Sequence, residues 1–430
     1  MEWGERYYRT GGFNILSVVV FHPSVAPFVQ QAARALYEKD LLERFYTTLF
    51  DNPESGSQKV LCALTRLGGF DLATQLKRRA ITEIPLSHVT GSAGGEILRL
   101  LSGRVDKSGR LTDSVWNWSE TSFDRKVSAQ LRPPIRGVYG YENSSQHTFE
   151  RAGDLGMRVF YDLPAPEAQF FLNIQKQELE AFPELQTSYQ KHTEAREEER
   201  MARRSAEWNA ADLIVVNSEF TRRSFLQANF PKKEIAVIPY GAPPPIAPLS
   251  IRTTENQKLQ LLWAGTFSIR KGAHYLLKAW RDNHLGRHAT LRIHGAVTLP
   301  ESILKPLPEG VAIAGSIPRS ELFTAYQKAD ALIFPTLFDG FGMVVTEAFA
   351  CALPVIATTS AGAADLIRDR ENGLLIAPGD TEAIASSIQW CLDNRAALSA
   401  MRPNALASAR SWQWEDYRAK LASEVRRVLS

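Results

Sequence analysis

Two carboxylates flank a glycine turn in the segment FDGFGMVVTEAF, residues 338–349. Asp339 stands directly before Gly340-Phe341-Gly342, and seven residues separate it from Glu347. An apolar run, ALIFP, precedes the turn and PVIAT follows it, so the pattern predicts strand, glycine turn, helix and strand. Backbone N–H groups at the start of a helix are unpaired and attract anions. The segment therefore places hydrogen-bond donors between two acceptors.

This order of groups suits a nucleotide sugar, which has hydroxyls at both ends and a diphosphate between them. Carboxylates accept hydrogen bonds from paired hydroxyls but repel a diphosphate, which helix amides attract. The competing structural interpretation is that Asp339 caps the helix and Glu347 faces solvent. A dinucleotide site is disfavoured, because Val345 replaces the third glycine of G-x-G-x-x-G and no acidic residue closes the next strand.

A second segment, WAGTFSIRKGAHYLL, places Arg270 and Lys271 in a turn between a predicted strand and a predicted helix. Basic turns are usually only solvated, but two cations at the carboxyl edge of a parallel sheet suit a diphosphate. No Asp-x-Asp motif occurs in the chain. We therefore expect a diphosphate site without metal, in which Arg270, Lys271 and helix amides carry the positive charge.

Strands and helices alternate in two series along the chain. The first series contains the strands FNILSVVVF, GVYGY, MRVFYDLP and ADLIVVNS, and the second begins at KLQLLWAGTF. Such alternation predicts an α/β protein with two doubly wound parallel sheets that face each other across a cleft. Five prolines in AVIPYGAPPPIAPLS predict a hinge between them. We expect a first domain at residues 1–240, a second at 241–411, and a last helix at 412–430 that packs back on the first domain.

The composition is that of a soluble globular protein large enough for two domains, with 430 residues, 44% hydrophobic and 23% charged. A net charge of +3 gives no reason to expect nucleic acid. Three distant cysteines, the lack of a leader sequence and short apolar runs favour a reducing cytosol. Basic residues are concentrated between Lys59 and Arg136. They form either a solvated face or a surface for an acidic acceptor or anionic lipid.

The second half of the chain resembles the retaining glycosyltransferases of family 4, the group 1 enzymes with the GT-B fold. The segments SIRKGAHYLLKAW, GSIPRSELFTAYQKADALIFPTLFDGFGMVVTEAFACALPVIAT and ENGLLIAPGD carry the resemblance, together with ADLIVVNSEFTRRSF and VIPYG before the hinge. The match is strong over residues 210–390, whereas the first 200 residues match only in outline. The resemblance implies two Rossmann-like domains of the GT-B type, with the donor nucleotide sugar held by the second.

The resemblance also implies residue roles. Asp339 would contact the donor sugar, Glu347 the ribose hydroxyls, and Lys271 the diphosphate. The remaining donor-binding positions are the turn and helix-start amides of Phe341, Gly342, Met343 and Val344, together with Gly265 at the end of the WAG strand and the backbone of Ile317 beside the base.

Three positions depart from the family pattern. Asp339 is one methylene shorter than the usual glutamate. Thr266 replaces an arginine that often follows Gly265, so we expect Arg270 to supply that charge. Asp162, in VFYDLP, replaces a histidine, and its carboxylate could accept hydrogen bonds from the donor sugar.

Other residues are candidates for the role of the missing histidine. His22, His147 and Glu142 each follow a predicted strand, and each is either such a substitute or an ordinary loop or helix-start residue.

The sequence thus predicts transfer of a sugar from a nucleoside-diphosphate sugar, more often UDP than GDP in the family, to a glycan, lipid-linked or small-molecule acceptor. Retention at the anomeric carbon, the absence of metal and cofactor, and a role in polysaccharide biosynthesis are part of this expectation. The alternatives are a non-catalytic sugar-nucleotide-binding subunit that regulates a polysaccharide complex, or another GT-B activity such as an epimerase. We expect the protein in the cytoplasm, or at the periphery of the inner face of the membrane through its basic first domain.

Overall fold

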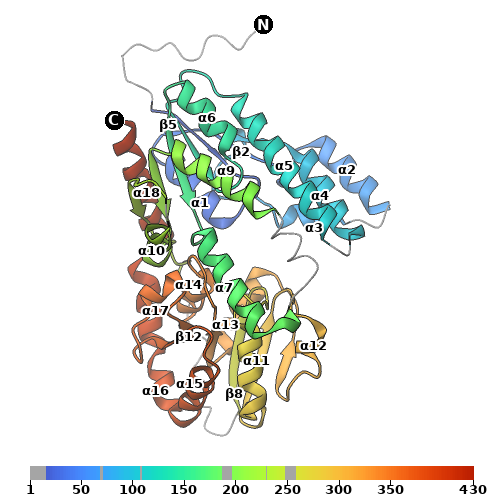
Figure 1. The fold of residues 1–430 in the computed structure, drawn as a ribbon, viewed down its shortest axis with the longest axis vertical. Coiled ribbons are helices and arrows are strands. Elements are labelled where there is room, and N and C mark those ends of the chain that lie inside the picture. The colour runs from blue at the N-terminus through green and yellow to red at the C-terminus, as the bar shows by residue number, and fades with distance from the viewer. Residues whose placement is uncertain (1–15, 68–70, 107–108, 186–195, 229, 247–257) are drawn as a thin grey trace.

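The computed structural model describes residues 16–67, 71–106, 109–185, 196–228, 230–246 and 258–430, and every structural statement below refers to these residues. They form two α/β domains, each built on one parallel sheet (Figure 1). The sheets contain seven and six strands, so the predicted class of two doubly wound parallel-sheet domains is confirmed.

The first sheet has the strand order β3-β2-β1-β4-β5-β6-β7. The first strand along the chain, VVVF, lies inside this sheet and is buried at all four positions, because helices cover both faces of the sheet. Its strands are β1 (Val18–Phe21), β2 (Leu42–Thr47), β3 (Val89–Gly91), β4 (Gly137–Tyr141), β5 (Arg158–Leu163), β6 (Leu213–Val216) and β7 (Ile235–Val237). The helices are α1 (Pro27–Tyr37), α2 (Gly56–Leu67), α3 (Leu72–Lys77), α4 (Ala93–Val105), α5 (Arg110–Ser128), α6 (Gln146–Asp154), α7 (Ala168–Ala181), α9 (Glu197–Ala210) and α10 (Glu219–Gln227).

The second sheet has the order β10-β9-β8-β11-β12-β13. The strands that follow β8 are first added on one side of it, as β9 and β10, and then on the other side, from β11 to β13, so the strand order reverses between β8 and β11. In open parallel sheets ligands bind at the carboxyl ends of the strands beside such a switch point. Its strands are β8 (Leu259–Ala264), β9 (Ala289–His294), β10 (Val311–Ile313), β11 (Ala331–Phe334), β12 (Val355–Thr358) and β13 (Gly373–Ile376). Its helices are α11 (Ala273–Asp282), α12 (Glu301–Leu304), α13 (Arg319–Lys328), α14 (Met343–Ala350), α15 (Thr381–Asp393), α16 (Arg395–Ala400) and α17 (Arg402–Ser411), and the chain ends in α18 (Trp414–Leu429).

The chain passes between the domains twice, and the two passages lie side by side. The amide of Ala242 donates to the carbonyl of Trp412 at 3.0 Å, and the indole of Trp412 donates to the carbonyl of Pro239 at 2.8 Å. A side chain at Gly241 would lie 2.1 Å from the backbone nitrogen of Trp414, so only glycine allows this close approach. The predicted proline hinge coincides with the first passage, although Pro248 lies outside the described residues.

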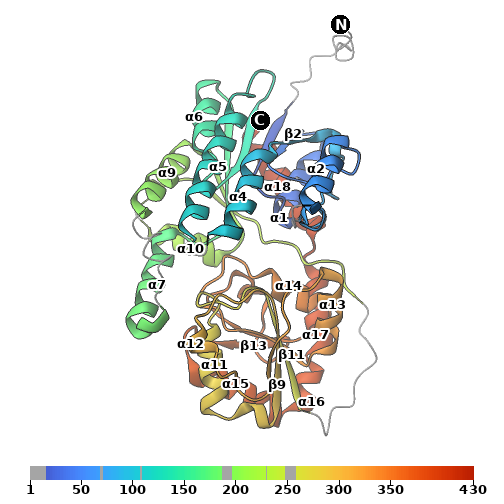
Figure 2. The ribbon, with the colours of Figure 1, turned by 90° about the vertical axis from the view of Figure 1, so that its right-hand side faces the viewer.

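Helix α18 packs against α1 of the first domain, as Figure 2 shows in red and blue. The guanidinium of Arg418 donates to Gln31 on α1 and to Glu38 directly after it, at 2.9 Å in each case. The domain boundaries at residues 240 and 411 stay predictions.

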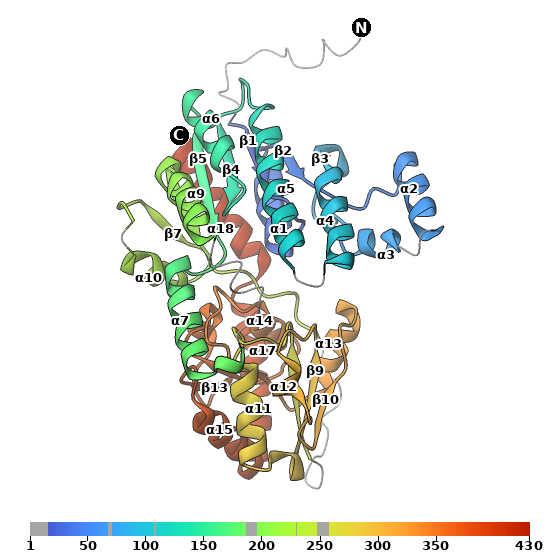
Figure 3. The same cartoon turned by 45° about the vertical axis from the view of Figure 1, so that its right-hand side comes forward.

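Helix α7 connects the domains on another side. It starts in the first domain and runs along the second toward α11 (Figure 3). The carboxylate of Glu178 on α7 lies 2.7 Å from the Nε2 atom of His274 on α11 and accepts from the hydroxyl of Tyr275 at 3.1 Å.

No helix in the described part of the chain is both long and apolar enough to cross a bilayer.

Candidate functional site

The glycine turn after β11 starts α14 without a side-chain cap. Gly342 is the N-cap residue, and its φ of +88° is a conformation that favours glycine. The first amides of α14, from Met343 and Val344, have no carbonyl one turn earlier in the helix to accept their hydrogen bonds. The interpretation of Asp339 as the helix cap is therefore wrong.

Lys271 and Arg270 converge on Asp339. The ammonium group of Lys271 forms an ion pair with the Oδ2 atom of Asp339, and a guanidinium nitrogen of Arg270 lies 3.5 Å from the same oxygen. The other carboxylate oxygen, Oδ1, accepts from the amide of Phe341 at 3.3 Å. Burial alone would raise the pKa of Asp339, but Lys271 and Arg270 outweigh it and hold this pKa below its ordinary value. Burial lowers the pKa of Lys271, and Asp339 offsets only part of that effect.

Aromatic rings hold the two cations in place. The ammonium nitrogen of Lys271 lies 4.7 Å from the ring centre of Phe334, and the guanidinium carbon of Arg270 lies 5.6 Å from that of Phe338. Such cation–π contacts favour the charged form of both side chains.

Gly272 brings the basic turn against the segment that follows β11. Its φ is +72°, and a side chain there would lie 1.9 Å from the carbonyl oxygen of Pro335. The amide of Leu337 also donates to the carbonyl of Arg270 at 2.9 Å. The order Arg-Lys-Gly thus lets two loops of the second domain meet at the ends of β8 and β11.

Glu347 is held by α13 instead of facing solvent. Its carboxylate accepts from Arg319 at 3.0 Å and from the hydroxyl of Tyr326 at 3.2 Å, and the side chain is only 12% exposed. Burial raises the pKa of Glu347 more than these two partners lower it. The interpretation of Glu347 as a solvated surface residue is therefore wrong. The sequence reasoning did not identify Arg319 and Tyr326, although their spacing of seven residues places them on one helix face.

The other predicted donor positions lie along the same edge of the second sheet. Gly265 follows β8 with a φ of +103°, and its amide donates to the carbonyl of His294 at 2.9 Å. Ile317, between β10 and α13, lines a hollow of 970 Å³ together with His294 and Glu321.

The first domain contacts the glycine turn directly. The carbonyl of Gly340 accepts from the hydroxyls of Ser218 at 2.6 Å and Thr221 at 3.2 Å. A side chain at Gly340 would lie 2.1 Å from the carbonyl oxygen of Pro164. Ser218 caps α10 by accepting from the amide of Thr221, and its second contact crosses from one domain to the other. Local pattern gives no signal for that contact.

Asp162 lies within β5 and not beyond its end. Its carboxylate accepts from the hydroxyl of Tyr139 at 2.6 Å, and burial raises its pKa to about 7. Burial raises the pKa values of Tyr141, Tyr240 and Tyr417, and the nearby charge of Asp162 raises them further. Its observed partner is thus a buried tyrosine, while the contact with a donor sugar stays a prediction.

The three candidates for the role of the missing histidine differ in their surroundings. Burial lowers the pKa of His22 to about 4, so the ring is neutral at pH 7, and it packs edge-on against Tyr141. His147 lies in the first turn of α6, where Asp124 holds both its backbone and its ring. Glu142 pairs with Arg204 at 3.1 Å.

His22 and Glu142 line a hollow of 550 Å³ at the carboxyl ends of β1 and β4. The walls of this hollow also carry Arg78, Arg79, Arg99 and Trp116, as well as Glu120, whose pKa burial raises to about 7. We call it the first-domain hollow.

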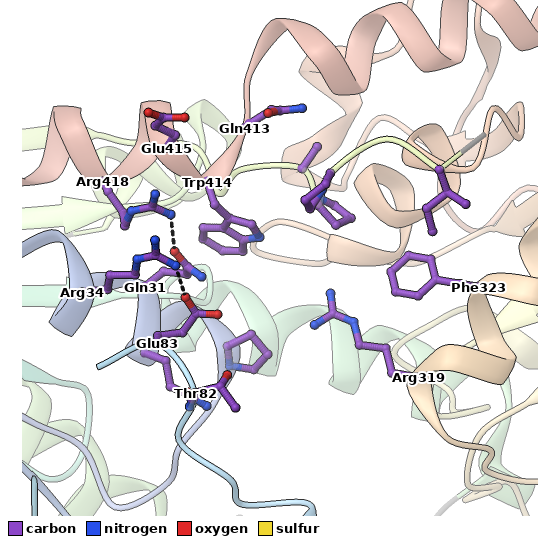
Figure 4. Close-up of a pocket in the computed structure, with 16 residues that line it drawn as sticks. Gln31, Arg34, Thr82, Glu83, Arg319, Phe323, Gln413, Trp414, Glu415 and Arg418 are labelled. Carbon is purple, nitrogen blue, oxygen red and sulfur yellow. Dashed lines mark hydrogen bonds and ion pairs between the residues drawn. The ribbon is translucent and has the colours of Figure 1, made fainter. Parts of the chain in front are cut away.

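A further hollow of 690 Å³ lies between the domains (Figure 4). Phe323 and Arg319 of α13 face Trp414 across it, while Arg34 and Arg418 are engaged with Glu83 and Gln31. Because Arg319 also bonds Glu347, this hollow borders the predicted ribose contact.

No group of three His, Cys, Asp or Glu side chains in the described ranges is arranged to hold a metal ion.

Comparison with known proteins finds relatives for part of the chain. Residues 258–394 match the family model of "Glycosyl transferases group 1". O-antigen chain mannosyltransferase B of Escherichia coli is 25% identical over 225 residues, which are 48% of this chain and 58% of that protein. Glycogen synthase of Mycobacterium tuberculosis is 27% identical over 172 residues, which are 38% of this chain and 41% of that protein. The matched region thus spans about half the length of these relatives, and it supports a relationship to the group 1 glycosyltransferases.

Solved structures match the whole fold. Sucrose-phosphate synthase from Thermosynechococcus elongatus aligns with a TM-score of 0.64 at 18% identity, over 96% of this chain and 98% of that one. HepE from Anabaena, solved in complex with UDP, aligns with a TM-score of 0.58 at 16% identity, over 96% of this chain and 100% of that one. The chain therefore has the GT-B fold.

Proposed function

We propose that this protein is a glycosyltransferase that moves a sugar from a nucleoside-diphosphate sugar to an acceptor. The observation that carries the proposal is the convergence of Lys271, Arg270 and Asp339 beside the uncapped start of α14. Cations and helix amides suit a diphosphate, while carboxylates suit the hydroxyls at either end of the donor. The match of residues 258–394 to the group 1 family model supports the same conclusion.

Glu347 is the proposed ribose contact. Its carboxylate is held in place by Arg319 and Tyr326 and stands one helical segment beyond the amides that would face the diphosphate. The first-domain hollow is the proposed acceptor site, because it opens at the carboxyl edge of the first sheet. Asp339 would accept from the donor sugar once the diphosphate draws Lys271 away from it.

The proposed reaction retains the configuration at the anomeric carbon. The acceptor oxygen forms a bond to that carbon while its bond to the diphosphate breaks, and the diphosphate leaves with the electron pair. The proton of the acceptor hydroxyl passes to the departing phosphate oxygen. Lys271, Arg270 and the amides of α14 would stabilise the negative charge that develops there.

UDP is the first nucleotide to test, because the structural neighbour HepE was solved in complex with UDP, alone and together with glucose. Thermal-shift titration with UDP, GDP and ADP should give a clear rise in melting temperature with one of them. Incubation of the matching sugar nucleotide with a panel of acceptors, in buffer containing EDTA, should then release nucleoside diphosphate. Binding without release for any acceptor would instead favour a regulatory sugar-nucleotide-binding subunit, and activity restored only by Mg²⁺ or Mn²⁺ would contradict a metal-free diphosphate site.

A further inference from the structure

Large apolar side chains are exposed mainly on one part of the first domain. The described residues include eleven exposed large apolar side chains, and seven of these belong to α2, α4 and α5. The other four, at Tyr37, Leu226, Leu307 and Ile313, lie outside these three helices, on different parts of the fold. An exposed apolar patch rimmed by polar residues marks an interaction site in a soluble domain.

Helices α4 and α5 form an antiparallel hairpin on the outside of the first domain, where they lie side by side in Figures 1 and 3. Small residues line their contact, since a side chain at Gly95 would meet Ser119 and one at Gly103 would meet Thr112. The face of α4 that turns away from α5 carries Leu98, Leu101 and Val105, which are 46, 45 and 75% exposed at helical spacing i, i+3 and i+7.

The free face of α5 continues this surface. Leu111 and Trp118, at spacing i and i+7, are 52 and 54% exposed, while Phe123 and Val127 on another face are buried in the core. Asp113 and Asn117 turn toward α9, where they bond Arg200 and Glu199. We call Leu98, Leu101, Val105, Leu111 and Trp118 the hairpin face.

The exposed charges on α4 and α5 have one sign. The exposed charged side chains of these helices are Arg104, Arg110, Arg125 and Lys126, and all of them are basic, while the half-buried Asp106 follows α4 directly. The acidic residues of the same two helices are buried or half-buried, and the structure engages them internally. Glu96 is shared by Arg79 and Arg99, Asp113 bonds Arg196 and Arg200, Glu120 accepts from the indole of Trp116, and Asp124 bonds His147 and Thr148.

We propose that the hairpin face docks on an anionic lipid bilayer. Apolar side chains with a tryptophan and a basic rim are the composition of a surface that lies in a membrane interface. A Lys or Arg near an anionic membrane strengthens binding by about fivefold, and four of them surround the apolar stripe. A second copy of this chain is a less suitable partner. It would place one basic rim against another, and the like charges would repel each other.

Docking would place the proposed acceptor site next to the membrane. The hairpin forms one wall of the first-domain hollow, through Glu96 and Arg99 on α4 and Trp116, Ser119 and Glu120 on α5. Among the acceptor classes expected from the sequence, this arrangement favours a lipid-linked acceptor. That last step rests on the proposed function, whereas the docking itself does not.

Vesicle flotation of the full-length protein tests the proposal. We expect it to float with vesicles of phosphatidylcholine mixed with phosphatidylglycerol, to bind vesicles of phosphatidylcholine alone at least tenfold more weakly, and to be released by high salt. Leu101→Glu with Val105→Glu, and separately Trp118→Ser, should each weaken flotation at least tenfold. Leu226→Glu is the matched control, because Leu226 is 59% exposed on α10, outside the hairpin face, and it should float like wild type.

Three outcomes would overturn the proposal. The first is a wild-type protein that does not bind anionic vesicles, and the second is equal binding to neutral and anionic vesicles. The third is a wild-type dimer, seen by light scattering, that Leu101→Glu with Val105→Glu converts to monomer. The rise in melting temperature caused by nucleoside diphosphate should be measured on the same variants. It should stay unchanged in them, because the hairpin face lies on the first domain and the proposed donor contacts lie on the second. If nucleoside diphosphate did not raise the melting temperature of the wild-type protein, the proposed function would be contradicted, but the interpretation of the flotation experiment would not change.

Discussion

Replacing Lys271 by methionine separates the structural role of the Lys271–Asp339 pair from its role in binding. Methionine keeps most of the side-chain length and removes the charge, so Asp339 remains with only Arg270 at 3.5 Å. The two side chains of the pair are 14% and 15% exposed, whereas Arg270 is 43% exposed and its contact is therefore screened by solvent. Lys271→Met thus leaves a buried carboxylate with little compensation.

The expected loss of stability follows from that burial. Removing one partner of a buried ion pair costs about 3–5 kcal/mol, and the contact with Arg270 places this case near the lower end. For a domain of this size, about 3 kcal/mol lowers the melting temperature by about 6–12 °C. Asp339 has a lowered pKa, so its stabilisation is present above its ordinary value of 3.8 and is lost as the pH falls through the lowered value. Wild type and Lys271→Met should therefore become more alike in stability at acid pH.

Affinity for nucleoside diphosphate should change differently when each residue of the Lys271–Asp339 pair is replaced. Lys271→Met removes a charged contact to the diphosphate, worth about 1.5–3 kcal/mol, or about tenfold to over a hundredfold in affinity for nucleoside diphosphate. Asp339→Asn releases Lys271 from its competitor, so affinity for nucleoside diphosphate should hold or rise while sugar transfer falls. Calorimetry with the nucleotide found in the thermal-shift screen measures both. A Lys271→Met affinity within about twofold of wild type, near ~0.4 kcal/mol, would refute the reasoning, as would a tenfold loss in Asp339→Asn.

Three further substitutions test neighbouring parts of the structure. Glu347→Gln should weaken nucleoside diphosphate and intact donor alike by about tenfold or more, and unchanged calorimetry would rule out a ribose contact. Asp162→Asn should gain stability relative to wild type as the pH rises from about 5 to 8. The raised pKa of Asp162 means that its buried, ionised form destabilises the wild-type fold, whereas asparagine does not ionise. A difference in melting temperature between the two proteins that stays constant across this pH range would contradict the expectation. Glu178→Ala should lower the unfolding free energy by about 2 kcal/mol, since the buried ring of His274 loses its partner, and denaturant titration beside the exposed control Glu180→Ala measures the difference.

Local pattern identified the segments that carry the candidate site but not the ion pair inside it. A glycine turn follows each of the neighbouring parallel strands β8 and β11, and Lys271 and Asp339 meet at that sheet edge, whereas the sequence reasoning gave them separate roles at the diphosphate and at the donor sugar. The strands themselves were recognisable because parallel strands covered on both faces are continuous apolar runs.

Asp162 shows the limit of inferring a side chain's direction from a strand pattern. The strand expected in MRVFYDLP is observed as β5, which extends through Leu163 and keeps Asp162 inside the sheet. Side chains alternate between the two faces of a strand, so a shift of one residue decides which face a carboxylate occupies. Arg319 and Tyr326 were not predicted for a different reason. Both lie on α13, and their contacts are with Glu347 on α14, a separate element.

A further set of contacts that local pattern could not predict joins the first domain to the donor segments of the second. Ser218 and Thr221 hold Gly340 from one side, and on α7 Phe171 packs against Phe338 with ring centres 5.2 Å apart. Farther along α7, Glu178 and Phe182 hold His274, three residues after Lys271. Both loops that carry the proposed diphosphate and sugar contacts are thus fixed partly by the opposite domain. Any movement between the domains that shifts α7 or α10 must also shift the loops bearing Lys271 and Asp339, so under the proposed function we expect donor affinity to depend on the arrangement of the domains.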